Sequence, residues 1–482
     1  MNRQPDPLDV LVIGGGASGL ATAWHLLRYG LEVELWEGQQ QAGGKIRSRV
    51  DKGWLTETGA SWLMDPAGDI APVLEGVGLG PLLVRKQPDA ARYLLRDGAL
   101  QNVPSTVGGM LGSGLFSVAG RLRLATEPLR LSKARPAETV SDFVVRRFGR
   151  EVLQYGIEPY VAGSLASDVK RAEAKATLPR LTALEERFGS ITAGVLCRRL
   201  LGNRRPAAPE AASFIGGMQS LIRSFSVTVR PVLERSAVSI SRAGSCWRVV
   251  ASDGSMVTAR HLVLATPAPE TAVLLQNTNQ NLAHLVAGIA YAPVMVVHLG
   301  VSRDAVQHPL DGTGFLVPRC ENRLVNGCLW PASVFSDRAP AGHVLLSCYL
   351  GGARHPHALR DDDDNAIAKV LSDLEPLLGL RADPVMTRVD RHPQALPLYF
   401  GAYSERLRSI GHQLKKLPGI HLASAYAGGV SVRDRLVQAE VVAKKISNEL
   451  QGSEVTRLAP TTPAKELPGT AVTGTGAVTQ TL

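Results

Sequence analysis

The pattern of apolar and polar residues predicts a strand–helix–strand unit near the start of the chain. Residues 9–13 (DVLVI) are largely apolar, as in a parallel strand that is buried on both faces. Residues 20–28 (LATAWHLLR) have the spacing of a helix, which Gly30 ends, and residues 32–36 (EVELW) predict the next strand. Together these segments make one βαβ unit of the usual length.

An inserted helical lobe is predicted between about residues 85 and 210. The segments 115–131 and 140–154 are amphipathic and rich in arginine, and 203–212 (NRRPAAPEAA) resembles a linker. From 121 to 206 the chain carries 17 basic and 9 acidic residues, a local net charge of +8 out of +10 for the whole chain. Such a segment favours an anionic membrane surface, an acidic substrate, nucleic acid or simply a solvated face. No nucleic-acid-binding motif accompanies it, so no nucleic-acid partner is predicted.

Strands dominate from about residue 213 onward, separated by turn signals. The tail at 452–482 is rich in Thr, Ala, Gly and Pro and is expected to be disordered. Between residues 213 and 452, two strands are predicted at 246–250 and 261–266, around a turn at Asp253-Gly254. One helix is predicted at 363–378, among the strands of 285–400, and a last helix at 437–450.

Length and composition indicate a globular protein of more than one domain. The chain has 482 residues, too many for one ordinary core, with 45% hydrophobic and 20% charged residues. The sequence predicts neither a signal peptide nor a membrane-spanning segment, because no run of about 18 apolar residues occurs. Five cysteines without a C-x-x-C pair favour buried thiols in a reducing cytoplasm over disulfides or a zinc site, and no metal is predicted.

A glycine-rich sequence stands between the first predicted strand and helix. Residues 14–19 (GGGASG) match G-x-G-x-x-G, and Glu37 follows Gly19 by 18 positions at the end of the second strand. Gly14 permits a sharp turn, Gly16 lets a pyrophosphate approach the backbone, and Gly19 lets the helix lie close to the strand. The helix N-terminus favours phosphates, and Glu37 can accept hydrogen bonds from a ribose. This unit predicts a dinucleotide site without distinguishing FAD from NAD.

The residues after this unit resemble the extended signature of the FAD-dependent amine oxidase superfamily. They comprise 41–49 (QAGGKIRSR), with a second glycine pair, and 57–59 (ETG). Within that superfamily, residues from about 8 to 447 resemble the protoporphyrinogen oxidase family. The resemblance is carried by 91–100 (ARYLLRDGAL), 158–168 (EPYVAGSLASD), 178–191 (LPRLTALEERFGSI), 213–221 (SFIGGMQSL), 264–267 (LATP), 314–318 (GFLVP), 335–340 (FSDRAP), 350–354 (LGGAR) and 421–436 (HLASAYAGGVSVRDRL).

The resemblance implies an α/β fold with a Rossmann-like FAD-binding domain, a mixed-sheet substrate domain and an inserted helical lobe that faces a membrane. The implied divisions are the FAD-binding domain at 1–84, 211–285 and 406–451, the helical lobe at 85–210, the substrate-binding domain at 286–405 and the tail at 452–482. FAD contacts are implied for Gly14, Gly15, Gly16, Ala17, Ser18, Gly19, Glu37, Gly38, Lys45, Gly59, Ala60, Ser61, Trp62, Val238, Val430, Ser431 and Val432. Substrate contacts are implied for Arg92, which would hold a propionate, and for Gly163, Leu316 and Tyr349.

The implied activity is FAD-dependent oxidation of protoporphyrinogen IX or coproporphyrinogen III to the porphyrin in haem biosynthesis, with O2 reduced to H2O2. The flavin carries the chemistry, so no catalytic side chain is predicted. The resemblance also implies a cytoplasmic protein with peripheral contact to the inner face of the cytoplasmic membrane, and it favours a homodimer.

The chain departs from the family at the isoalloxazine and substrate end. Ser61 replaces an asparagine, Ser167 a glycine, His392 a tryptophan, and Ser424-Ala425 a Gly-Asn pair. Three alternatives therefore stay open at this point: another reduced metabolite as substrate, an amine oxidase or desaturase-type reaction, and a non-catalytic FAD-binding protein.

Overall fold

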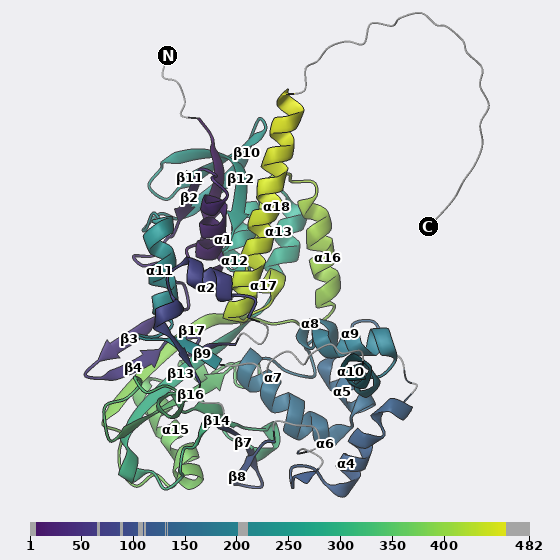
Figure 1. The fold of residues 1–482 in the computed structure, drawn as a ribbon, viewed down its shortest axis with the longest axis vertical. Coiled ribbons are helices and arrows are strands. Elements are labelled where there is room, and N and C mark those ends of the chain that lie inside the picture. The colour runs from purple at the N-terminus through teal and green to yellow at the C-terminus, as the bar shows by residue number, and fades with distance from the viewer. Residues whose placement is uncertain are drawn as a thin grey trace, which may run out of the picture.

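The computed structural model describes residues 6–64, 68–86, 90–104, 109, 112–130, 132, 134–200 and 211–458. Within these ranges the structure has two large sheets and a helical lobe. In the view of Figure 1 the first sheet lies at the top, and the second sheet and the lobe lie side by side below it. Most of the predicted linker at 203–212 and the tail beyond residue 458 lie outside the described residues. The predicted α/β class is confirmed.

The first sheet contains the N-terminal βαβ unit. Its order is β10-β11-β12-β1-β2, with β18 also paired to β12, and β1 runs parallel to both β2 and β12. Val10 and Val12 pack into one core cluster, and Leu11 and Ile13 into another, so helices cover both faces of the sheet. The strands are β1 (Leu8–Ile13), β2 (Val33–Trp36), β10 (Ala237–Ala243), β11 (Cys246–Ala251), β12 (Met256–Leu264) and β18 (Ile420–Leu422).

The helices of this domain begin earlier than apolar periodicity predicts. The first helix starts at Ala17, with Gly16 as its N-cap, and the last starts at Val432 because Ser431 Oγ accepts a hydrogen bond from Asp434 N (3.1 Å). Their opening turns, ASG in the first helix and VRDR in the last, hold mainly small or charged residues and therefore carry little apolar signal. The helices are α1 (Ala17–Arg28), α2 (Ala71–Gly76), α11 (Gln219–Val229), α12 (Ala268–Leu275), α13 (Gln280–Ala287), α16 (Tyr403–Leu414), α17 (Ala425–Gly428) and α18 (Val432–Leu458).

The second sheet has the order β17-β13-β16-β15-β14-β7-β8 and packs against α15. The predicted helix at 363–378 is confirmed as α15 (Asp363–Leu378), capped by Asp362. The strands are β7 (Ala91–Arg96), β8 (Ala99–Asn102), β13 (Tyr291–Ser302), β14 (Gly312–Leu316), β15 (Val325–Leu329), β16 (His343–Gly351) and β17 (Met386–Pro397), with α14 (Pro331–Val334) beside them. Two small sheets are also present, β3 (Ser48–Asp51) with β4 (Trp54–Glu57), and β5 (Leu63–Met64) with β9 (Ala211–Phe214) and β6 (Leu83–Arg85).

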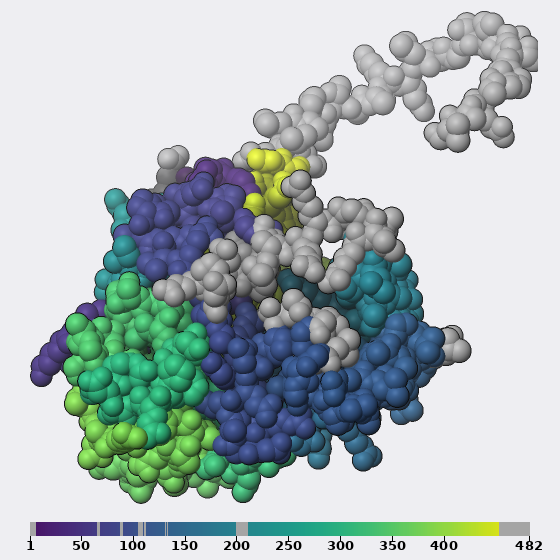
Figure 2. Space-filling model, turned by 60° about the horizontal axis from the view of Figure 1, so that its bottom comes forward, coloured from purple at the N-terminus to yellow at the C-terminus, as the bar shows by residue number. Residues whose placement is uncertain are grey.

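The helical lobe lies beside the second sheet, as the blue-to-teal and green regions of Figure 2 show. The predicted single helix at 140–154 is interrupted at Gly149, whose φ of +93° favours glycine. Arg147 is fully buried and pairs with the equally buried Glu127, so part of the lobe's charge is internal. The elements are α4 (Val118–Ala125), α5 (Val140–Arg147), α6 (Arg150–Val152), a π-helical turn η3 (Leu153–Ile157), α7 (Glu158–Leu165), α8 (Ala174–Thr177), α9 (Pro179–Phe188) and α10 (Ile191–Leu200). Among the described residues, no helix is both long and apolar enough to cross a bilayer.

Candidate active site

The turn from β1 into α1 requires two of its glycines for reasons internal to the protein. Gly14 has a φ of +107° and donates its N–H to Trp36 O (2.8 Å), which joins the turn to β2. A Cβ on Gly19 would lie 1.9 Å from Gly14 O, so only glycine lets α1 pack this closely on the turn. The roles predicted for Gly14 and Gly19 are therefore visible in the backbone.

Gly16 differs from both, because nothing within the protein requires a glycine there. Its φ of −72° and ψ of 178° suit any residue, and a Cβ at this position would meet no atom within 4 Å. No side chain caps α1, and its first turn holds no acidic residue. Open space beside an uncapped helix N-terminus suits a diphosphate, so these residues fit the dinucleotide predicted to lie against Gly15, Gly16, Ala17 and Ser18.

Glu37 is held in place at the end of β2. Its Oε2 accepts a hydrogen bond from Gly15 N (2.7 Å) and its Oε1 one from Gln39 N (2.8 Å), which leaves lone pairs on both oxygens for a ribose. Gly38 lies against Ser236, since a Cβ there would be 2.2 Å from Ser236 Oγ. Two residues further, Val238 lies half exposed on β10. The contact between Gly38 and Ser236 thus brings the residue after Glu37 close to the start of the segment that holds Val238.

Two cations, the partly buried Lys45 and the buried Arg435, lie on the segments predicted to reach the flavin. Lys45 Nζ donates to Ala395 O (2.6 Å) and lies 5.3 Å from the centre of the Tyr291 ring. Burial lowers the pKa of Lys45 to about 8, although Glu270 opposes the shift. Such a poorly solvated ammonium fits an anionic partner, in agreement with its predicted contact to FAD.

Arg435, on the first turn of α18, is a candidate cofactor contact that the sequence analysis did not include. It is 6% exposed, and its Nε and Nη2 have no hydrogen-bond partner among the described residues. Burial lowers its pKa to about 10, while Tyr399 and Asp434 oppose the shift. A signal was present in the sequence: position 435 falls on the apolar stripe of α18, with Val432, Leu436 and Ala439. A buried, partly unpaired guanidinium next to the predicted 430–432 contacts fits an anionic or electron-rich cofactor.

The turn at 59–62 is held by side chains at which the chain departs from the family. Ser61 Oγ and Tyr349 OH are 2.8 Å apart, which joins a predicted cofactor contact to a predicted substrate contact. His392 Nε2 donates to Thr58 O (2.6 Å). Ser424 Oγ donates to Thr266 O (2.8 Å), two residues after the end of β12. These polar replacements therefore make hydrogen bonds of their own in place of the family's residues.

Glu57, which opens this turn, is buried at 4% exposure. Its Oε1 accepts from Met218 N (2.8 Å) and its Oε2 from Ser48 Oγ (2.7 Å). Burial raises its pKa to about 7, although these hydrogen bonds and Arg338 lower it. Glu57 thus anchors β4 to the Gly217–Met218 turn with a carboxyl group that tends to hold its proton.

The predicted substrate residues lie on neighbouring strands of the second sheet. Leu316 pairs with Gly327, which in turn pairs with Tyr349, so a row crosses β14, β15 and β16. Gly163 of α7 packs onto this row, because a Cβ there would be 2.5 Å from Leu316 Cδ2. Burial raises the pKa of Tyr349 to about 12, so its hydroxyl keeps its proton at neutral pH.

Arg92 lies at the edge of the same region and is exposed. Leu94 pairs with Leu316, and Arg92 precedes Leu94 by two positions, so both side chains leave β7 on the same face. The structure therefore places Arg92 on the same face as this row, and within the described part of the chain its guanidinium has no partner. Its substrate contact, like the other site assignments, stays a prediction.

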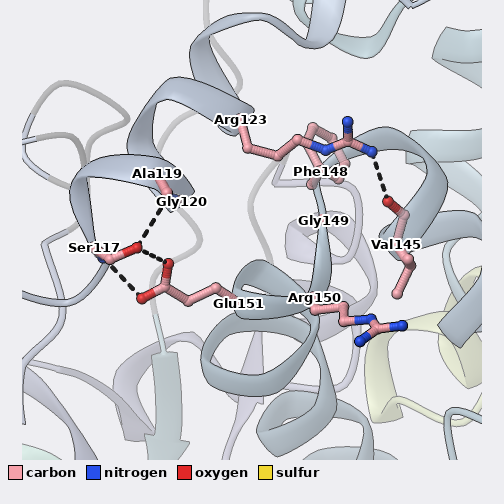
Figure 3. Close-up of a pocket in the computed structure, with 9 residues that line it drawn as sticks. All are labelled: Ser117, Ala119, Gly120, Arg123, Val145, Phe148, Gly149, Arg150 and Glu151. Carbon is pink, nitrogen blue, oxygen red and sulfur yellow. Dashed lines mark hydrogen bonds between the residues drawn. The ribbon is translucent and has the colours of Figure 1, made fainter.

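A surface hollow of about 370 Å³ lies elsewhere, in the helical lobe (Figure 3). Ser117, Arg123, Phe148 and Glu151 contribute to its lining. Ser117 N and Oγ both donate to Glu151 (2.8 and 2.7 Å), and Arg123 donates to Val145 O (3.1 Å). These polar groups are already engaged with one another, and the hollow shares no residue with the glycine-rich turn, so it is not the flavin site.

Comparisons with known proteins agree with this geometry. A mitochondrial protoporphyrinogen oxidase of Nicotiana tabacum is 29% identical over 460 residues, which cover 88% of this chain and 91% of that protein. A coproporphyrinogen III oxidase of Bacillus subtilis (strain 168) is 26% identical over 89% of this chain and 96% of its own length. A crystal structure of a candidate protoporphyrinogen oxidase from Exiguobacterium sp. 255-15 shares the fold, with a TM-score of 0.77, 23% identity and coverage of 92% and 99%.

The family of flavin containing amine oxidoreductases matches residues 17–444, nearly the whole described chain. The predicted FAD cofactor and the predicted oxidoreductase class are thereby confirmed. The match begins at the first residue of α1 and extends into α18, so it includes Lys45, Arg435 and the whole second sheet. The chain belongs to the flavin containing amine oxidoreductase family.

Proposed function

We propose that this protein oxidises a porphyrinogen, protoporphyrinogen IX or coproporphyrinogen III, to the corresponding porphyrin, with O2 as the electron acceptor and H2O2 as the second product. The observation that carries the proposal is the likeness to two porphyrinogen oxidases over about nine-tenths of the chain, substrate sheet included. The row Leu316–Gly327–Tyr349 supports it, because glycine and leucine on neighbouring strands leave a flat, mainly apolar surface.

Several residues of this chain would prepare the site for that reaction. FAD, when bound, supplies the two-electron acceptor. Lys45 and Arg435 offer positive charge to it, and Glu37 offers acceptors to its ribose. Tyr349 holds a proton at its hydroxyl and fixes the 59–62 turn through Ser61. Arg92 supplies a guanidinium for a propionate at the rim.

The test is an anaerobic reduction of the purified yellow protein. Bleaching of the flavin absorbance by a porphyrinogen, followed in air by porphyrin fluorescence, is the expected result, and putrescine serves as the amine control. Bleaching by the amine alone would indicate that the protein is an amine oxidase. If no donor reduces the flavin, the proposed enzymatic activity is refuted. Comparing the two porphyrinogens decides between two and four substrate carboxylates.

The role of Arg92 has a separate test. Arg92→Ala is expected to raise KM for a porphyrinogen about ten-fold with flavin content unchanged, the effect of losing one charge-assisted hydrogen bond at an exposed position. Arg248→Ala, an exposed strand arginine of the first sheet, is the control and leaves KM unchanged. An unaltered KM in the Arg92 variant would exclude Arg92 from the site.

We further propose peripheral contact of the helical lobe with an anionic membrane. Val118 and Leu122 of α4 are 74% and 64% exposed and lie one turn apart, with Arg121 between them in sequence. Exposed apolar side chains among basic residues favour such a surface. Flotation with phosphatidylglycerol vesicles, but not with phosphatidylcholine vesicles, is expected, and V118D/L122D should abolish it.

The homodimer and the cytoplasmic location stay predictions. Light scattering, which measures the mass of the particle in solution, would test the homodimer.

A further inference from the structure

Three side chains of kinds that commonly ligate metals lie close to one another in the nucleotide-binding domain, away from the glycine-rich turn. His261 lies on β12, His421 on the neighbouring strand β18, and Glu449 on α18. His421 pairs with Val263, two positions after His261, so both imidazoles leave the sheet on the same face. That face carries α18, because Val263 packs in the same core cluster as Leu436 and Ala443.

This cluster lies apart from the flavin chemistry. His261 pairs with Val10 across β1, four residues before Gly14. At about 3.3 Å per strand residue, roughly 13 Å separate the cluster from the turn that receives the diphosphate. None of the three residues is among those assigned to FAD or to the substrate.

The spacing of the three atoms matches ligands that share one ion. His261 Nδ1 and His421 Nε2 are 3.0 Å apart, and Glu449 Oε2 is 3.7 Å from the former and 3.5 Å from the latter. Zinc bonds of about 2.0–2.1 Å to nitrogen and oxygen in tetrahedral geometry put neighbouring ligand atoms about 3.3 Å apart. The three distances bracket that value. The two imidazole nitrogens lie within hydrogen-bond distance of each other, and the carboxylate oxygen lies within ion-pair distance of both.

The charges around the cluster leave the histidines in the form that metals bind. Burial lowers the pKa of His261 to about 4 and that of His421 to about 3, so both imidazoles are neutral at physiological pH. Asp9 opposes the shift at His261, whereas Arg260 and Lys445 add to it. Lys445 Nζ lies 3.7 Å from the other carboxylate oxygen, Glu449 Oε1, which leaves Oε2 turned toward the histidines. A bound cation would face one carboxylate and two neutral nitrogens.

We propose that His261, His421 and Glu449 form a binding site for one divalent first-row metal ion, with Zn²⁺ the best match. Two imidazoles and a carboxylate are ligands that zinc prefers, and three protein ligands leave a fourth position for water. Since Glu449 is 40% exposed on its side chain, the ion can enter from solvent. The ion would fasten the second half of α18 to β12 and β18.

The test uses tag-free, flavin-loaded protein and Co²⁺ as a spectroscopic probe. One equivalent of Co²⁺ is expected to bind with the intense visible bands of a four-coordinate ion, and Zn²⁺ is expected to displace it. Saturating Zn²⁺ should raise the melting temperature by about 2–5 °C. Glu449→Gln, at an exposed position that does not threaten folding, should weaken binding at least about ten-fold, and His421→Gln should do the same.

His412→Gln, which changes an exposed histidine on α16 of the same domain, is the matched control and should bind Co²⁺ like the parent. Failure of the parent to bind Co²⁺, binding without four-coordinate bands, unchanged affinity in both ligand variants, or equal loss in the control would each overturn the site. Flavin content and oxidase turnover of Glu449→Gln should equal those of the parent. The test of the metal site is therefore independent of whether the protein oxidises a porphyrinogen.

Discussion

The nucleotide-binding end and the substrate end of this molecule are built by different means. At the nucleotide end, the shape of the site is set by the backbone. Gly14 turns the chain, Gly19 lets α1 pack closely on that turn, and Gly16 leaves open space beside the helix N-terminus. At the substrate end, side chains far apart in sequence hold the turn, as the hydrogen bond between Ser61 and Tyr349 illustrates. At the first end the backbone requires glycine at positions 14 and 19, whereas at the second end several family residues are replaced by others that form hydrogen bonds here. Cofactor binding is thus fixed by main-chain shape, and the substrate end is free to diverge.

The sharpest test of this comparison is Gly16→Val. Because a Cβ at position 16 meets no protein atom, the flavin-free variant should fold with a stability within about 1 kcal/mol of the parent. The side chain would occupy the space of the diphosphate, so FAD affinity should fall about 10³-fold, or about 4 kcal/mol. Flavin absorbance and equilibrium dialysis measure it. Gly19→Ala is the contrasting variant, since its Cβ would overlap Gly14 O and lower the stability of the flavin-free protein as well. Parental flavin content in Gly16→Val would contradict the role of this open space.

At the substrate end, the largest effect is expected from Glu57→Gln. The folded-state pKa of Glu57 is raised from 4.5 to about 7, so its protonated form is favoured by folding. The contribution of Glu57 to the free energy of unfolding is therefore complete below about pH 4.5. It decreases as the pH rises toward about 7 and is absent at higher pH. The glutamine variant should therefore be more stable than the parent at pH 8, by about 2–3 kcal/mol, and should gain little at pH 5. Urea unfolding at both pH values measures this. Glu75→Gln, on exposed α2, should show no such difference, and equal gains at both pH values would refute the assignment.

Arg435 belongs to the nucleotide end but acts through its side chain, and so it tests how far the comparison holds. Arg435→Met removes a buried charge with unpaired N–H groups, so the flavin-free protein should gain about 1 kcal/mol or more. FAD affinity should fall about ten-fold, and the flavin reduction potential should fall too, because positive charge is lost near the reduced ring. Lys444→Met, an exposed change on the same helix, should alter neither quantity. A variant that is destabilised without FAD and binds it normally would assign Arg435 a structural role only.

The smallest effect is expected for the Ser61–Tyr349 pair. A double-mutant cycle of Ser61→Ala and Tyr349→Phe should give a coupling free energy of about 1 kcal/mol, the worth of one buried hydrogen bond. Chemical unfolding of the four proteins measures it. Coupling near zero would mean that the 59–62 turn is held by other contacts, such as the bond from His392 to Thr58.

The same contrast explains how much could be predicted from the sequence. The βαβ unit, the turn at Gly14, the close packing at Gly19 and helix α15 depend on local patterns, and the structure agrees with them. The break at Gly149 was missed because amphipathic periodicity continues across it. Arg435 could have been found from its position on the apolar stripe of α18.

Long-range pairs carried no signal that one sequence could reveal. Ser61 and Tyr349 are 288 positions apart, and His261 and His421 are 160 apart, so only the folded strands bring each pair together. The cysteine spacing led to the prediction that no metal is bound, yet the candidate ligands are histidines and a glutamate on three separate elements. Sequence spacing predicts metal sites only where the ligands share one local segment.

The packing of α1 against α18, the first and last helices of the described chain, has a consequence for biosynthesis. Roughly 400 residues separate them, which a ribosome adds in about 20–80 s at common elongation rates. Until β12 is complete at residue 264, strand β1 of the nascent chain has an unpaired edge, and β18 and α18 are added only near the end of the interval. Loading with FAD is therefore expected only after synthesis has passed residue 432, so the abundance of active enzyme would depend on protection of this edge while the chain is still being made.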